Sequence, residues 1–152
     1  MYKKTIIVTL LIVIGLVSTG LIWKEAQEES EIGGIKISRS LYVMMNPVEK
    51  TKYEYLIKNS LAGDLDALKN LIEFWCGGAS LCYDHGETLV KVADRIGEDK
   101  FIRILPKMSV EERAYLKLLL GAGLEYGKFE KQDSLLTIEK RFPKLSKALT
   151  NS

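Results

Sequence analysis

The residues whose types and spacing could support chemistry begin with a cysteine pair. Cys76 and Cys82 are the only cysteines, and five residues that include two glycines separate them. A disulfide across so short a turn would constrain the unfolded chain by about 2 kcal/mol. We therefore predict a structural disulfide between Cys76 and Cys82. Two buried, unpaired thiols are one alternative. A redox-active pair is another, although active dithiols usually have two intervening residues and stand at a helix N-terminus.

The only histidine, His85, follows this pair. Together with Asp84 or Glu87 it could complete a zinc site, but zinc sites in small domains use tighter paired spacings, and a disulfide would remove both thiolates. As a general base, His85 would need a positioned nucleophile, and no Ser lies in a nucleophile-elbow pattern. We expect a solvated loop residue at this position, with no catalytic residue, metal or cofactor in the protein. The alternative is a small hydrolase or redox enzyme that uses His85, Glu87 or Cys76 and Cys82.

Aromatic residues near the cysteines suggest protein binding instead. Tyr and Trp are the side chains that most often anchor protein contacts. Tyr83 lies beside the predicted disulfide, next to Asp84 and His85, and Trp75 precedes Cys76. We predict that Trp75, Tyr83, Asp84 and His85 form an exposed tip that contacts a partner.

The stretch that places these residues in the cell is the apolar segment 5–23. It contains nineteen residues without a charge, and a helix of that length covers roughly 28 Å, close to the hydrocarbon core of a bilayer. Lys3 and Lys4 precede it, and acidic residues follow it, which favours a cytoplasmic tip at 1–4. We predict a single-pass anchor in the bacterial inner membrane with the C-terminal domain in the periplasm. The alternative is a cleaved signal peptide, with small residues at 18–20 as the cleavage site.

Charge excludes one class of partner. The formal net charge of +2 corresponds to Lys3 and Lys4, because 22 basic residues face 20 acidic ones in the whole chain. The exported part is therefore close to neutral, whereas a nucleic-acid-binding domain needs a basic stripe. We expect no nucleic-acid partner.

Beyond the anchor, we predict a tether at 24–45, one all-α domain at 46–143 and a frayed tail at 144–152. Asn46, Pro47 and Glu49 together form a helix start with a capping box. Helices are expected from Pro47 to Gly63, from Asp64 past Trp75, at 89–96, at 101–105, from Ser109 onward, and from Asp133 to Pro143. The glycines at 121, 123 and 127 are expected to loosen or end the helix that starts at Ser109.

The first two of these helices are joined by only a short turn, and the pattern recurs 34 residues later, with Gly63 over Gly97 and Leu68 over Ile102. The segment 60–71, SLAGDLDALKNL, resembles the core of Sel1-like repeats, a relative of the tetratricopeptide class; the segment 93–101 is similar. The resemblance covers about residues 46–106 and implies stacked helical hairpins that bind protein. At the second copy Phe101 stands where the family has a small Ala, which puts the close helix approach in doubt.

Together these features predict a non-catalytic, membrane-tethered periplasmic protein-binding module. A small exported helical protein of this kind resembles immunity proteins that block an envelope-acting toxin, which is an analogy of size and location. The alternative within the binding class is an accessory subunit of an envelope complex.

Overall fold

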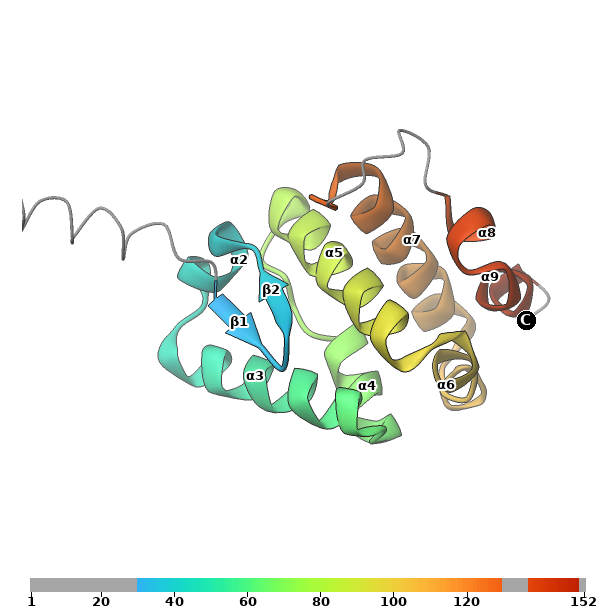
Figure 1. Cartoon of the computed structure of the whole chain (residues 1–152), viewed down its shortest axis with the longest axis horizontal. Coiled ribbons are helices and arrows are strands. Elements are labelled where there is room, and N and C mark those ends of the chain that lie inside the picture. Colours follow the sequence, from blue (N-terminus) through green and yellow to red (C-terminus); the bar gives the residue numbers. More distant parts are fainter. Residues whose placement is uncertain (1–29, 130–136, 151–152) are drawn as a thin grey trace, which may run out of the picture.

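The computed structural model describes residues 30–129 and 137–150, which form a mainly helical domain with one small antiparallel sheet (Figure 1). The elements in chain order are β1 (Ser30–Ile32), β2 (Ile35–Ile37), α2 (Arg39–Met44), α3 (Pro47–Ala62), α4 (Leu65–Ile72), α5 (Ala79–Ile96), α6 (Glu98–Ile102), η1 (Leu105–Lys107), α7 (Val110–Tyr126), α8 (Ile138–Arg141) and α9 (Pro143–Thr150). The expected predominance of helix is confirmed.

The predicted anchor at 5–23 and the tip at 1–4 lie outside the described residues. Within 30–129 and 137–150, every helix is too short or too polar to cross a bilayer.

The first described element is a β-hairpin, which corrects the predicted tether for residues 30–45. Strands β1 and β2 pair antiparallel with Ile32 opposite Ile35. Gly33 and Gly34 make the two-residue turn at positive φ of 59° and 80°, the geometry that matches the twist of a tight hairpin. The alternation of residues turns Ile35 and Ile37 to one face, where both are buried in the core. Residues read as linker therefore belong to the folded domain.

The helical hairpin α3–α4 follows the sequence prediction closely at its start and its turn. The Asn46 side chain accepts hydrogen bonds from the backbone N–H groups of Val48 and Glu49, and the Glu49 carboxylate accepts one from the Asn46 N–H. Gly63 turns the chain at φ 94°, and Asp64 caps α4. Helix α4 ends at Ile72, earlier than expected, which leaves Trp75 in the loop before α5.

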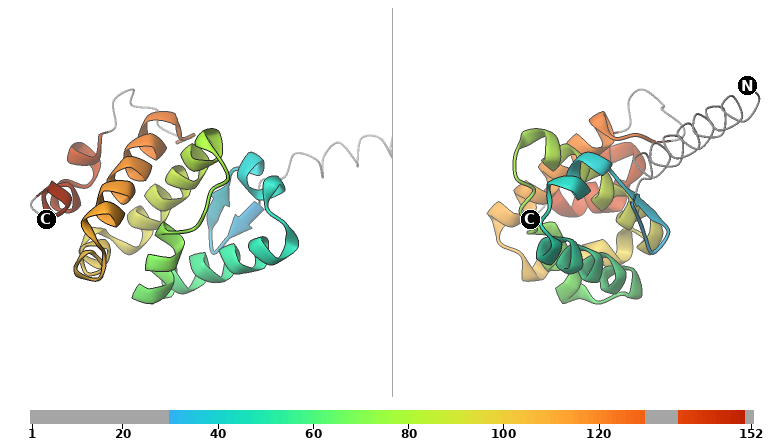
Figure 2. Two further views of the ribbon diagram at one scale, coloured as in Figure 1. Left: turned by 180° about the vertical axis from the view of Figure 1, so that it is seen from behind. Right: turned by 90° about the vertical axis from the view of Figure 1, so that its left-hand side faces the viewer.

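Helices α5 and α7 lie side by side at the centre of the domain (Figures 1 and 2). Helix α5 begins at Ala79, ten residues before the first predicted apolar position, Leu89. Helix α7 runs through Gly121 and Gly123 and ends at Tyr126, with Gly127 as its C-cap. The helix is therefore not interrupted at Gly123, contrary to the expectation. Instead, this glycine lies against the backbone of α5 at Gly86. The two glycines permit a contact that a methyl group at either position would block.

The last described elements are two short helices, α8 and α9, which corrects the predicted frayed tail for residues 144–150. Helix α8 ends just before Pro143, as expected, but Pro143 is also the first residue of α9. Leu145 is fully buried, and its backbone N–H donates to the Glu98 carboxylate at 2.8 Å. Arg141 of α8 makes a two-pronged ion pair with Asp94 of α5. The predicted cap at Asp133 lies outside the described residues.

Candidate functional site

The structure places Cys76 and Cys82 at disulfide distance, as predicted. Cys76 lies in the loop between α4 and α5, Cys82 lies in the first turn of α5, and their Cα atoms are 5.0 Å apart with the sulfurs within bonding distance. Gly77 reverses the chain between them at φ 79°. Cys76 is buried, and its sulfur is 3.6 Å from the Tyr115 hydroxyl of α7. The pair therefore ties the loop that contains Trp75 to the central helices.

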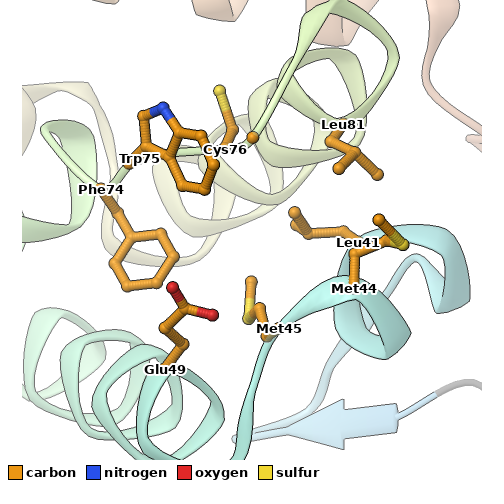
Figure 3. A pocket seen from close by; sticks show the side chains of 9 residues that line it. Leu41, Met44, Met45, Glu49, Phe74, Trp75, Cys76 and Leu81 are labelled. Carbon is orange, nitrogen blue, oxygen red and sulfur yellow. The ribbon is translucent and has the colours of Figure 1, made fainter.

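Trp75 stands at the rim of a small apolar pocket, which we call the apolar pocket (Figure 3). Trp75 is 76% exposed, and Met44, at the end of α2, is 70% exposed. The side chains around the hollow come from α2 and the residue after it, from α3, from the loop before α5 and from α5 itself: Leu41, Met44, Met45, Glu49, Phe74, Trp75, Cys76 and Leu81, with the backbone of Gly77.

The chemistry of this pocket suits an apolar side chain from another molecule. Met side chains are flexible and polarisable, so they adapt to the shape of an inserted group. The one carboxylate in the lining, Glu49, already accepts a hydrogen bond from the Asn46 N–H at 2.9 Å. The apolar pocket therefore offers contact surface and no reactive group.

His85 does not line this pocket, and the expectation of a solvated loop histidine is wrong. It lies inside α5, is fully buried, and its Nδ1 is 2.8 Å from the hydroxyl of Tyr53 on α3. Burial lowers its pKa to about 4, although the carbonyls of Leu71 and Ile72 favour protonation and oppose the shift. Neither carbonyl completes a hydrogen bond to Nε2 with good geometry. We assign a neutral ring whose Nδ1 accepts from Tyr53, with the proton on Nε2.

The four residues of the predicted binding tip do not form one surface, because each lies in a different environment. Tyr83 is partly exposed and stacks on Tyr126 of α7, with ring centroids 4.7 Å apart. Asp84 accepts a hydrogen bond from the Ser40 hydroxyl. His85 is in the core and cannot touch a partner in this structure. Trp75 is thus the one member of the tip that lines the apolar pocket.

The residues of the alternative enzyme are likewise not brought together. The Glu87 carboxylate pairs with Lys91 at 2.6 Å and lines a different pocket from Cys76. His85 is buried in the core, where its Nδ1 is hydrogen-bonded to the Tyr53 hydroxyl. Across 30–129 and 137–150, there is no group of three His, Cys, Asp or Glu side chains that could hold a metal ion.

Sequence reasoning missed the part of the apolar pocket that α2 and the residue after it provide. Leu41, Met44 and Met45 lie at spacings of three and four residues, which is the helical period. That signal was available within the segment read as tether. Phe74 and Leu81 carried no comparable signal, because they reach the pocket only through the fold of the loop and the early start of α5.

The fold and the site define a small helical domain with an N-terminal β-hairpin, a cysteine pair at disulfide distance and a Met- and Trp-lined apolar pocket. Comparisons with models of known protein families, with curated proteins and with solved structures gave no match. The resemblance to Sel1-like repeats therefore stays a prediction. The two hairpins it would relate differ in size, with helices of 16 and 8 residues in α3–α4 and of 18 and 5 in α5–α6.

Proposed function

We propose that this protein is a membrane-tethered periplasmic binding module that holds a protein partner through the apolar pocket. The observation that carries the proposal is Trp75, which leaves 76% of its surface in water at the rim of the apolar pocket. An aromatic side chain buries roughly 150–250 Å² when it is covered. At about 25 cal/mol per Å², covering the exposed part of Trp75 would contribute on the order of 3 kcal/mol to binding.

The position of Trp75 also favours a role as an anchor. It follows Phe74, which packs against Tyr53 at 4.9 Å between ring centroids, and it precedes Cys76, which is held near Cys82. A residue whose backbone is held on both sides loses less conformational freedom on binding, and such preorganised residues make effective interface anchors. The partner side chain that fits beside it is apolar, because the lining offers methyl, methylene and thioether groups.

Location supports the same proposal. Cysteine pairs form and persist as disulfides in oxidising compartments such as the bacterial periplasm, and the apolar segment 5–23 is long enough to deliver the domain there. Within the binding class we infer an immunity-type role, in which the domain occludes an envelope-acting toxin. This narrower inference rests on analogy of size and location.

Replacement of Trp75 tests the binding proposal. A photo-crosslinking amino acid at Met44 of the full-length protein, activated in the host cell, should capture a specific partner. With that partner purified, we expect Trp75→Ala to weaken binding at least tenfold, measured by calorimetry. This follows from the loss of about 3 kcal/mol of apolar contact, partly offset by adaptation of the methionines.

The matched control is Tyr55→Ala. Tyr55 is also an exposed aromatic residue, at 60%, but it lies on α3 and outside the apolar pocket. Its replacement should change affinity less than twofold. Equal losses in the two variants, or no loss in Trp75→Ala, would remove the apolar pocket as the contact surface.

The location is tested separately with a C-terminal reporter. Alkaline phosphatase matures only where its disulfides form, so a fusion after Ser152 should be active in intact cells. A fusion of the same chain with residues 5–23 deleted should be inactive. Activity that does not depend on residues 5–23, or a full-length fusion that stays inactive and cytosolic, would contradict the proposed topology.

A further inference from the structure

A second pocket lies where the β-hairpin and the start of α2 meet α5, and Lys128, just after α7, completes its wall. We call it the basic pocket. Four cations line it, Lys36, Arg39, Lys91 and Lys128, together with one carboxylate, Glu87. Figure 1 shows β2 between α2 and α5. Lys36 and Ile37 of β2 line the pocket, as do Glu87 and Lys91 of α5.

One of these cations is already neutralised. The Lys91 ammonium pairs with Glu87 at 2.6 Å, the two side chains are only 24% and 8% exposed, and Lys91 also donates to the Lys36 carbonyl at 2.8 Å. Lys36, Arg39 and Lys128 have no ion pair with another described residue. They are exposed and surround one hollow. The basic pocket therefore has three cations in excess, in a domain that is otherwise close to neutral.

Hydroxyl groups accompany the cations. Ser38 and Ser40 line the pocket, and their hydroxyls are 2.7 Å apart. Ser40 donates to the Asp84 carboxylate, which lies just outside the lining, so Ser40 accepts from Ser38 and both hydroxyl protons are used within this chain of hydrogen bonds. A planar guanidinium and two mobile ammonium groups form a donor set that matches a tetrahedral oxyanion such as phosphate.

The place of the basic pocket relative to the apolar segment identifies the source of the phosphate. Ser30 is paired with Ile37, which itself lines the pocket. Six residues, 24–29, separate Ser30 from Trp23, and an extended chain of that length spans at most about 21 Å. If 5–23 crosses the bilayer as proposed, the basic pocket must lie within that reach of the lipid headgroups. The linker therefore allows the domain to bring this positive cluster within a Debye length, about 8 Å, of the surface, where anionic lipid attracts it.

We propose that the basic pocket binds the phosphate of an anionic phospholipid headgroup and thereby orients the domain on the membrane. This inference rests on the proposed tether. Such an orientation places the β-hairpin toward the bilayer and fixes how the apolar pocket is presented to a partner.

The test uses the full-length protein in lipid nanodiscs, with the acetylation rate of each lysine measured by mass spectrometry. In discs with 30% phosphatidylglycerol, Lys36 and Lys128 should be acetylated at least threefold more slowly than in discs of pure phosphatidylcholine. Lys52 of α3 is an exposed lysine outside the basic pocket, and its rate should stay within 1.5-fold.

Matched variants separate a site from general charge attraction. Arg39→Gln should abolish the protection of Lys36 and Lys128, whereas Lys52→Gln, which removes the same charge elsewhere, should leave it intact. Equal loss of protection in both variants would overturn the site. Protection by 10 mM inorganic phosphate in pure phosphatidylcholine discs would identify a soluble phosphate anion and overturn the lipid source.

The remaining outcomes distinguish this inference from the proposed function. Insertion into the discs without protection of Lys36 or Lys128 removes the lipid site and leaves the tether standing. A chain that does not co-purify with the discs removes the tether and the lipid site together.

Discussion

Gly86→Ala is expected to destabilise the domain by about 3 kcal/mol, the upper end of the usual cost of overpacking a core. A methyl group at Gly86 would overlap the Leu119 carbonyl oxygen of α7 and lie 3.0 Å from the Gly123 nitrogen. These are backbone atoms inside a hydrogen-bonded helix, so they cannot move aside as a side chain can. Helices α5 and α7 would have to separate along the whole central contact.

The measurement is thermal unfolding of the full-length protein followed by circular dichroism. For a domain of this size, 3 kcal/mol corresponds to a fall in Tm of about 12 °C. Gly123→Ala should give a similar fall, because its methyl group would overlap the backbone of Gly86.

Gly121→Ala is the matched control on the same helix. The nearest atom to a methyl group at Gly121 is the end of the Ile138 side chain at 3.9 Å, an ordinary contact. Alanine is favoured over glycine in a helix interior by up to about 1 kcal/mol, so this variant should keep or raise the Tm. A Tm for Gly86→Ala within 3 °C of the unchanged protein would contradict the close contact.

The same glycines show where sequence reasoning succeeded and where it failed. Helix starts were predicted to the residue at Asn46 and Ser109, because a capping box involves only four consecutive residues and both boxes form. The glycines at 121 and 123 were read by intrinsic propensity alone. Tertiary contact decided the role of Gly123 instead, since Gly123 lies against Gly86, 37 positions earlier in the chain.

The β-hairpin was missed for a related reason. The alternation of Ile35 and Ile37 was visible in the sequence, but a strand needs a partner, and its partner is the three-residue segment Ser30–Ile32 after an acidic stretch. Burial of these isoleucines depends on α5, which begins more than forty residues later in the chain. Local patterns therefore located most helices, while the basic and apolar pockets, which both need residues 36–45, required the assembled fold.

The burial of His85 could not be predicted from its neighbours in sequence either, and it leads to the second large effect. In the unfolded chain an imidazole titrates near pH 6.5, whereas in the folded protein burial lowers the pKa to about 4. Between these values the unfolded state binds more protons than the folded state. Stability is therefore complete above pH 6.5 and falls as pH decreases, by up to about 1.4 kcal/mol per pH unit, until pH 4.

We expect a loss of about 2 kcal/mol at pH 5 from this one group. Several carboxylates with lowered pKa values, among them Glu111 and Glu139, shift stability in the same direction at acid pH. The contribution of His85 must therefore be isolated by difference. His85→Asn removes the titrating group and keeps an acceptor for the Tyr53 hydroxyl, although it leaves a smaller side chain and lowers stability at pH 7.

The decisive quantity is the difference in unfolding free energy between the protein and His85→Asn, measured in urea at pH 7 and pH 5. It should narrow by about 2 kcal/mol as the pH falls, because only the protein with the histidine loses that contribution. Since His85 is the only histidine, its single imidazole resonance in an NMR titration gives the folded pKa directly, and the midpoint should lie near 4. A midpoint near 6.5, with parallel stability curves, would mean that the ring is solvated and that the Tyr53 contact does not hold α3 against α5.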